Sequence, residues 1–393
     1  MAAAPEAPAT AKSHIDPAAA FVPVQTRSER PTSFDPDEFG SPTGLEVNWK
    51  HTPVSRLSQL TEADVETRDA EITIRSAEGA VTHARVPIGT APRGEVFVPE
   101  DVVAARAWQN STEAHLIRIP ADVEVDQPIL ATVRGTGAVA ATHLIVDAGT
   151  NSRATVLIDH HGSGLLAENV ELIVRDGAAL TVVALQQWED SAIHLSSHQA
   201  RVDAAATLRH IVVTLGGDIV RVNPSVTLSG AGSAGQLYGL SFADAGQHFE
   251  SQVFLYHRGP QTVGDVLYKS ALQGKGARTV WIGDVLIGSA ATGTDSYEAN
   301  RNLVLSDGAR ADSIPNLEIE TGDIVGAGHA SATGRFDDEQ LFYLLSRGIP
   351  EAQAQRMVVL GFLSEIVQKI GIPDVEQHLL AELERELTEG RHS

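Results

Sequence analysis

The stretch that decides the fold runs from residue 146 to residue 240 and contains four copies of one short pattern. In each copy an apolar residue is followed by Asp or Gly among small residues, and then by an apolar run. The copies read VDAGTNSRATVLI (146–158), VRDGAALTVVAL (174–185), VDAAATLRHIVV (202–213) and LSGAGSAGQLYGL (228–240). They recur about every 28 residues, a period that is typical of stacked repeat units.

Two further copies, at 272–284 and 305–317, extend the repeat toward the C-terminus. Small residues at a fixed place in each copy suit a tight corner where one coil lies on the next. Asn151, Asp176 and Asp203 are placed to cap such corners. The repeat therefore favours a parallel β-helix over a β-sandwich, whose turns come about every 8–12 residues. Ordinary hairpin turns in a large sandwich remain the alternative at this point.

Strand follows strand from about Glu71 to Thr333, and the chain is expected to be mainly β. The predicted strands are Glu71–Arg75, His115–Ile119, Ile129–Val133, His143–Val146, Ala154–Ile158, Val170–Val174, Leu180–Leu185, Arg209–Val213 and Val280–Ile287. Only Pro99–Gln109 has a helical pattern in this region. Strands without intervening amphipathic helices exclude a doubly wound α/β fold.

Four parts are expected along the chain. Residues 1–44, rich in Ala, Pro, Ser and Thr, are predicted to be disordered or loosely ordered. Residues 45–110 form an N-terminal mixed or helical part, in which Trp49 is expected to be buried. Residues 111–335 form the β-helix core, and residues 336–393 form a C-terminal helical domain.

The C-terminal domain has a period of about 3.6 residues, typical of amphipathic helices. Its first helix begins at Asp337, Asp338 and Glu339, where the helix dipole favours negative charge. Two apolar stripes follow, one with Met357, Leu360, Leu363, Val367 and Ile370, and the other with Val375, Leu379, Leu383 and Leu387. We expect these stripes to pack on the end of the β-helix, with a separate subunit as the alternative.

Composition excludes several classes of function. A net charge of −22 argues against nucleic-acid binding, and no apolar run is long enough to span a membrane. The chain has no cysteine, so any metal ligand must come from His, Asp or Glu, or from a partner's thiolate. The N-terminus lacks the features of a secretory signal, and we expect a cytoplasmic protein.

His329 is the first candidate metal ligand, because the small residues of Gly326–Ser331 leave its imidazole open to approach. A hydrogen-bonded turn histidine is the alternative. His257, between a strand and a turn, is the second candidate.

Other polar groups are expected to be structural. The sequence predicts a surface strand end at Asp159–Gly162, which contains His160 and His161. The four-residue spacing of His194 and His198 is only a weak indication of a metal site. Glu318 and Glu320 are predicted to lie on a solvated strand face. The sequence contains neither a phosphate-binding loop nor a nucleophile elbow.

Several blocks together resemble the SufB/SufD family of scaffolds for iron–sulfur cluster assembly. They are NWKHT (48–52), YHR (256–258), WIG (281–283), NRNLVLS (300–306), PNLEIE (315–320), His329, DDEQ (337–340) and FYLLSRGI (342–349). The match covers about residues 45–375, and the part at 300–349 is the most specific.

The resemblance implies a right-handed parallel β-helix with N- and C-terminal helical parts and no catalytic activity of its own. It implies a complex in which SufB and SufD pair through their β-helices while each helical end binds a SufC ATPase. Here Asp338, Glu339, Phe342, Tyr343 and Arg347 would contact SufC. A homodimer is the alternative for the chain alone.

The chain is most like SufD, because SufB supplies a thiolate that this sequence cannot provide. The resemblance implies that His329 binds iron or a transient iron–sulfur cluster shared with SufB, supporting iron supply. Many SufD chains carry a thiol where Ala327 stands here. No motif indicates a flavin. A β-helix polysaccharide-active enzyme and a homodimeric structural protein without a metal are the rival hypotheses.

Overall fold

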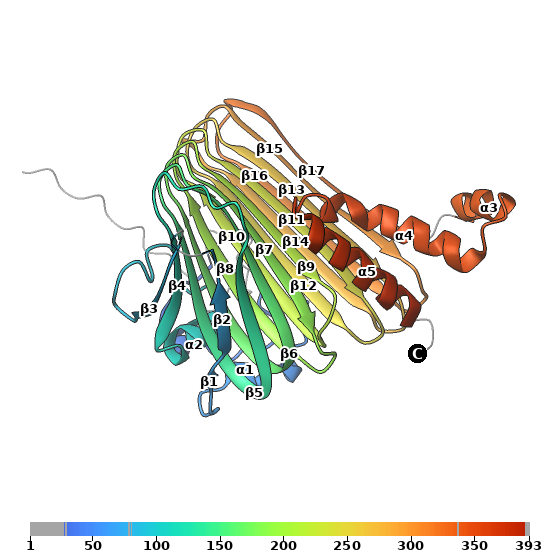
Figure 1. The fold of residues 1–393 in the computed structure, drawn as a ribbon, viewed down its shortest axis with the longest axis horizontal. Coiled ribbons are helices and arrows are strands. Elements are labelled where there is room, and N and C mark those ends of the chain that lie inside the picture. Colours follow the sequence, from blue (N-terminus) through green and yellow to red (C-terminus); the bar gives the residue numbers. More distant parts are fainter. Residues whose placement is uncertain (1–26, 28–29, 78, 80, 336–337, 390–393) are drawn as a thin grey trace, which may run out of the picture.

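The centre of the molecule is a parallel β-solenoid of about eight turns, with helices near both ends of the chain (Figure 1). The computed structural model describes residues 27, 30–77, 79, 81–335 and 338–389. The expected fold class, a mainly β parallel β-helix with N- and C-terminal helical parts, is confirmed.

Each turn of the solenoid contributes two long strands to two walls. The walls are built from β5 (Ile129–Ala148), β6 (Arg153–Val174), β7 (Ala179–Trp188), β8 (Ile193–Val202), β9 (Thr207–Thr214), β10 (Ile219–Leu228), β11 (Ala234–Ala243), β12 (His248–His257), β13 (Val263–Leu272), β14 (Arg278–Ile287), β15 (Thr294–Val304), β16 (Arg310–Ile319) and β17 (Ile324–Arg335). One wall stacks β6, β8, β10, β12, β14 and β16, and the other stacks β7, β9, β11, β13, β15 and β17, all in parallel register. β5 and β6 are long strands that each merge two of the predicted ones.

The register reproduces the repeat read from the sequence. Leu165 lies opposite Ile193, and Leu180 lies opposite Leu208, so each pair is 28 residues apart. At the corners, the side-chain amide of Asn151 donates to Asp122 Oδ1 at 3.0 Å, and Asp176 Oδ1 accepts from the Ala204 amide at 2.9 Å. The predicted corner role is confirmed for Asn151 and Asp176, whereas the side chain of Asp203 accepts from Arg201 Nε at 2.9 Å.

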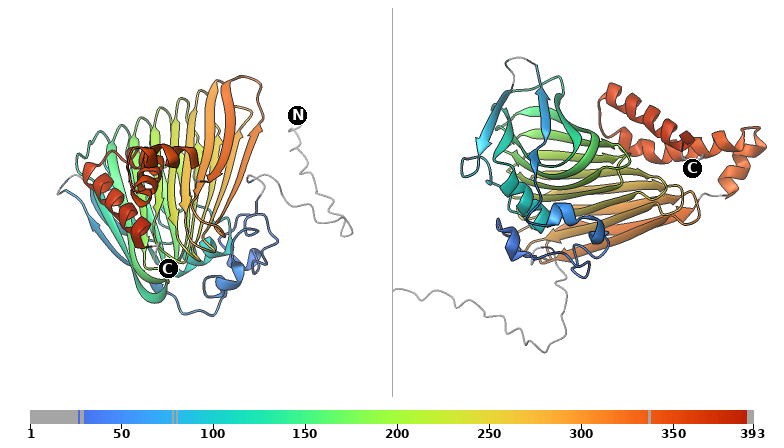
Figure 2. Two further views of the ribbon diagram at one scale, coloured as in Figure 1. Left: turned by 90° about the vertical axis from the view of Figure 1, so that its right-hand side faces the viewer. Right: turned by 90° about the horizontal axis from the view of Figure 1, so that it is seen from below.

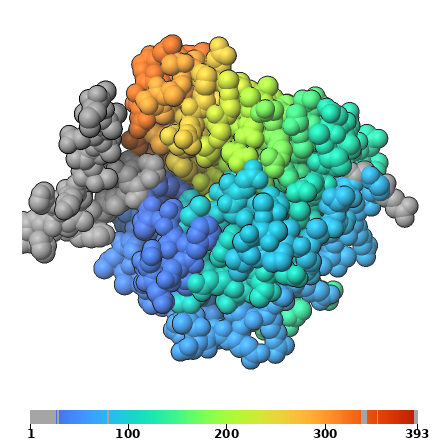
Figure 3. Space-filling model, turned by 90° about the vertical axis from the view of Figure 1, so that its left-hand side faces the viewer, coloured from blue at the N-terminus to red at the C-terminus, as the bar shows by residue number. Residues whose placement is uncertain are grey.

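The N-terminal part covers one side of the first coils. It contains η2 (Pro36–Glu38), η3 (Val54–Arg56), α1 (Ser58–Thr61), β1 (Arg68–Asp69), β2 (Glu71–Arg75), β3 (Thr82–Pro87), α2 (Val102–Asn110) and β4 (Glu113–Ile119). Trp49 is buried as expected, with the Arg221 guanidinium 4.0 Å from its ring centroid. Figure 3 shows this part spread over the solenoid wall. Arg27, within the segment expected to be loosely ordered, donates to Glu100 and to the Gln252 carbonyl. Residues 1–26 of that segment lie outside the described residues.

The C-terminal helices are α3 (Asp338–Ser346), α4 (Glu351–Val367) and α5 (Pro373–Glu389). α4 and α5 pack on the outer side of the wall that contains β9, β11 and β13, where Leu363, Leu379 and Leu383 meet Val213 and Leu240. The expectation that they cap the end of the β-helix is therefore wrong, as Figures 1 and 2 show. The reason is that this wall is apolar on its outer face and its coils offer a longer surface than the end does.

One residue of the predicted apolar stripe is not buried, because the side chain of Met357 is 49% exposed. α3 extends away from the solenoid beyond α4 (Figure 1). No helix among the described residues has both the length and the apolar character needed to cross a membrane.

Leu363→Ala should destabilise the docking of α4 by about 2–5 kcal/mol, because it leaves a cavity at a fully buried position. Met357→Ala on the same helix should change the free energy of unfolding by less than about 0.5 kcal/mol. Chemical unfolding followed by circular dichroism measures both variants. Equal losses would contradict the side-wall packing of the helix.

Candidate functional site

Among the described residues, no further coil follows the last turn of the solenoid. β16 pairs with β14 and β17 pairs with β15, and neither strand has a further partner strand among the described residues. Most side chains of β17 are exposed, and Val325 is 74% exposed. Because an edge strand presents unpaired backbone groups, this end is suited to receive another polypeptide.

His329 lies on β17 at this open end, in parallel register with Glu298 on β15. Its Nδ1 is 3.7 Å from Glu298 Oε1. The histidine side chain is 44% exposed, whereas that of Glu298 is 1% exposed. Gly283 makes room for the carboxyl group, because a Cβ there would lie 2.4 Å from Glu298 Oε2. A partly open imidazole therefore stands beside a buried carboxyl.

Glu298 has unusual electrostatics for a glutamate. Neither of its carboxyl oxygens has a hydrogen-bond partner among the described residues. Burial, with a further contribution from the negative charge of Asp284, raises the pKa of Glu298 to about 8. The carboxyl group is therefore largely protonated at neutral pH. A cation bound beside it would favour the ionised form and lower this pKa. Together Glu298 and His329 can offer one oxygen and one nitrogen ligand to a metal.

The sequence analysis missed Glu298, although the signal was present. Glu298 precedes His329 by 31 residues, which is one turn of this part of the solenoid. A search for polar residues one turn before each candidate histidine would have found it.

Glu298 and His329 are called the rim of the solenoid below. A polar network lies next to this rim, inside the last turn. The side-chain amide of Asn302 donates to Asn300 Oδ1 at 2.8 Å, to Ser313 Oγ at 2.9 Å and to Thr333 Oγ1 at 3.1 Å. Three strands, β15, β16 and β17, are thereby joined inside the last turn. Both asparagines of the NRNLVLS block, Asn300 and Asn302, belong to this network.

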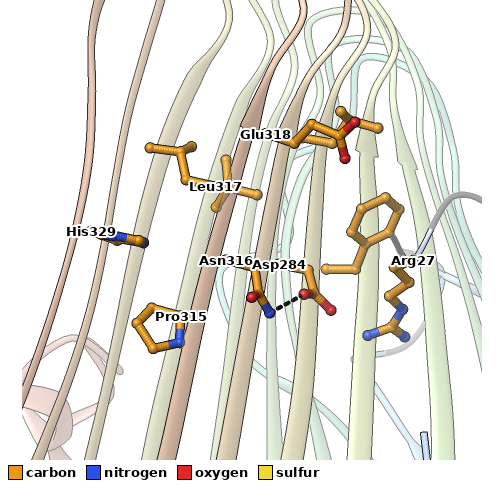
Figure 4. A pocket seen from close by; sticks show the side chains of 10 residues that line it. Arg27, Asp284, Pro315, Asn316, Leu317, Glu318 and His329 are labelled. Carbon is orange, nitrogen blue, oxygen red and sulfur yellow. Dashed lines mark hydrogen bonds between the residues drawn. The ribbon is translucent and has the colours of Figure 1, made fainter. Parts of the chain in front are cut away.

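A pocket of about 390 Å³ opens at the same end and is lined by His329, Pro315, Asn316, Asp284 and Arg27, among others (Figure 4). Within it, the side-chain amide of Asn316 donates to Asp284 Oδ1 at 2.7 Å. The pocket brings a cation, a carboxylate and the candidate imidazole to one opening.

His257 lies elsewhere, buried at the end of β12. Its Nδ1 is 2.8 Å from Thr262 Oγ1 and its Nε2 is 2.9 Å from Ser296 Oγ. Burial lowers its pKa to about 4, which keeps the ring neutral at pH 7. A metal would have to displace one hydroxyl, so its role as a ligand stays a prediction.

Three more expectations can be placed. Glu318 and Glu320 are exposed as predicted. Phe342 and Tyr343 lie on α3 with exposed fractions of 72% and 57%, and the Arg347 guanidinium lies 5.2 Å from the Tyr343 ring centroid. The side chains of Asp338 and Glu339, at the start of α3, are outside the described residues.

The adjacent histidines do not form the predicted surface strand end. His161 is partly exposed and pairs with Asp159 at 2.7 Å, but His160 is fully buried inside the solenoid. His194 and His198 are buried beside it. The physical reason is that Gly162 and Gly164 bend β6 within the wall and do not end it there.

Glu298→Gln should change how stability depends on pH in the metal-free chain. Because the pKa of Glu298 is raised in the folded state, its contribution is complete below about pH 4.5 and is lost as pH rises to about 8. The variant should therefore gain stability relative to wild type, by up to a few kcal/mol, between pH 5 and pH 9. Urea unfolding across this range tests it, and parallel curves for the two proteins would contradict the raised pKa.

Comparisons with known proteins place the chain in one family. Residues 131–362 match the family model described as the SUF system FeS cluster assembly, SufBD core domain. The chain is 51% identical to the iron–sulfur cluster assembly SufBD family protein Rv1462 of Mycobacterium tuberculosis, with 93% of this chain and 94% of that protein covered. It is 49% identical to the SufBD family protein ML0594 of Mycobacterium leprae, with 91% and 93% covered.

A second, more distant relative is found in the same organism. The chain is 29% identical to the SufBD family protein ML0593 of Mycobacterium leprae, over 74% of this chain and 33% of that protein. The matched region of the family model contains the whole solenoid wall from β6 to β17 and both rim residues, Glu298 and His329. The chain is thus a member of the SufBD family of iron–sulfur cluster assembly proteins.

Proposed function

We propose that this chain is the SufD-type, non-catalytic subunit of an assembly scaffold, and that its open end pairs with a SufB-type subunit. The single observation that carries the proposal is the combination of an uncovered last turn with His329 at its rim. Mycobacterium leprae has both a close and a distant relative of this chain, which supports a complex of two different family members.

The chemistry of the rim supports a shared site. The chain has no cysteine, so a soft thiolate ligand for iron must come from the partner. His329 would add a nitrogen and Glu298 an oxygen from this chain. The cargo would be iron or a nascent iron–sulfur cluster, held where two edges meet and released when the pairing changes.

The exposed edges of β16 and β17 supply the surface for this pairing. Val325 and Ile319 expose apolar side chains there, and the edge strands offer backbone groups to a second solenoid. A second copy of this chain would meet the same edges, but it would bring no thiolate to His329.

We further propose that α3 binds the ATPase subunit. Phe342 and Tyr343 are large apolar residues that the helix holds in solvent, and exposed aromatic side chains are enriched in protein interfaces. Arg347 lies over Tyr343 and adds a cationic group to the same surface.

His329→Ala in the complex with the partner subunit and ATPase should keep the assembly intact but lose most of the iron and cluster absorbance after anaerobic reconstitution, because one ligand is missing. His83→Ala, an exposed histidine on β3, is the matched control and should behave as wild type. Iron analysis and visible spectroscopy give the readout. Wild-type cluster yield in the His329→Ala complex would remove this residue from the site.

The double variant Phe342→Ala and Tyr343→Ala should weaken ATPase binding by at least about 2 kcal/mol, as expected for interface aromatics. Leu45→Ala, which also removes an exposed apolar side chain, should leave binding unchanged. Isothermal titration of the intact chain with the ATPase measures both. Unchanged affinity of the double variant would place the ATPase elsewhere.

A further inference from the structure

A cluster of four histidines and one glutamate lies inside the solenoid, far from the open end. His160 and Glu168 come from β6, His194 and His198 from β8, and His210 from β9. All five side chains are at most 1% exposed. The lumen around them is filled with aliphatic residues, and buried polar groups in such surroundings are costly unless they have partners. Four to five coil-to-coil steps of about 4.8 Å put the cluster roughly 20–24 Å along the solenoid from the last turn, which contains His329.

Hydrogen bonds fix the tautomers of two of these rings. His160 Nδ1 is 2.9 Å from the Leu185 carbonyl oxygen, which can only accept, so Nδ1 carries the proton. His194 Nδ1 is 2.8 Å from Gln186 Oε1, and that oxygen also accepts from the Trp188 indole N–H at 2.7 Å. Both rings therefore direct Nε2 toward the same place, and in a neutral ring with this tautomer Nε2 carries the lone pair.

That place is Glu168. Its Oε2 is 3.0 Å from His160 Nε2, 3.4 Å from His194 Nε2 and 3.9 Å from His198 Nε2. Lone pairs on nitrogen and oxygen repel at these distances unless a proton or a cation stands between them. One proton on His160 would satisfy only the first contact.

The remaining atoms are left without partners. Glu168 Oε1, His194 Nε2 and His198 Nε2 have no hydrogen-bond partner among the described residues. His194 Nε2 carries the lone pair of a neutral ring because Nδ1 donates to Gln186, and His198 Nε2 does so when His198 Nδ1 donates to His210 Nε2, 2.9 Å away. These buried oxygen and nitrogen atoms converge on one point and can each give an electron pair to a metal ion bound there.

We propose that His160, Glu168 and His194 bind one divalent first-row transition-metal ion inside the solenoid, with His198 as a fourth ligand. The ligand atoms of the first three lie within 4.8 Å of one another. The Nε2 atoms of His160 and His194 are 3.0 and 3.4 Å from Glu168 Oε2, near the separation of about 3.4 Å between two ligands that hold one ion tetrahedrally at about 2.0–2.2 Å. Imidazole and carboxylate ligands suit Zn²⁺ or Fe²⁺, not Ca²⁺ or Mg²⁺.

The outer contacts match those of known metal centres. Metal-binding histidines usually donate their second N–H to a carbonyl or carboxylate, as His160 and His194 do to Leu185 and Gln186. The Ser196 hydroxyl donates to Glu168 Oε2 at 3.1 Å and holds the carboxylate in place. An ion here would join two neighbouring coils and would be a resident ion, separate from the cargo at the rim. This inference does not depend on the proposed function.

The test begins with the intact wild-type chain, purified from medium supplemented with Zn²⁺ or Co²⁺, because the buried ligands require loading during folding. After dialysis against a weak chelator, metal analysis should find one ion per chain. X-ray absorption of the Co²⁺ form should count two or three imidazoles. Wild-type chain without retained metal under both loading conditions, or metal without imidazole ligands, would overturn the proposal.

Variants then assign the site. Glu168→Gln and His194→Gln should lower metal affinity by well over the roughly 10–100-fold that loss of an outer contact causes. His143→Gln is the matched control, because His143 is an equally buried histidine whose Nε2 is 3.3 Å from Glu171 Oε2. It lies on the outer side of the wall beside Trp108, and the described residues place no second imidazole next to this pair. His329→Ala controls for the rim. Full metal content in the Glu168 and His194 variants would contradict the assignment, and if these variants fail to fold, the imidazole count of the wild type decides.

Discussion

The in-register stacking of coil on coil is the constraint on which the rest of the structure depends. Parallel hydrogen bonding between turns places residues about one repeat apart directly above one another. Glu298 and His329 become neighbours in this way, and so do Glu168 and Ser196. The same stacking leaves the final strands with one free edge each, because nothing in the described part of the chain adds a further coil.

The position of the C-terminal helices keeps them away from this free edge. α4 and α5 bury their leucines on the side of the solenoid, so neither of these helices covers the last turn. Burial then acts differently on the two polar groups at the rim. It keeps Glu298 protonated and without a partner, while His329 stays accessible. A buried acid next to an open imidazole is a costly arrangement for an isolated chain, and the proposed cation and second polypeptide would relieve it.

The repeat made the architecture predictable, since small residues at fixed places mark corners and the period gives the coil length. The side on which the helices pack was not predictable, because an apolar stripe shows that a helix is covered but not by which surface. The buried histidines were underestimated for a different reason. His194 and His198 are four residues apart, which pairs two side chains on a helix, but an even separation on a strand also puts both side chains on one face. Neighbouring side chains on a strand point to opposite faces, so the pair His160 and His161 cannot bind one ion together, but this does not show that His160 faces the lumen.

Protection of β16 and β17 from hydrogen–deuterium exchange tests the central claim most directly. In the chain alone, the backbone amides that face the free edges of these strands should exchange rapidly. On addition of a SufB-type partner they should become protected, while the amides of α4 and α5 on the side wall should not change. Protection confined to the side wall, or no new protection at residues 310–335 in a complex shown to have formed, would contradict the account.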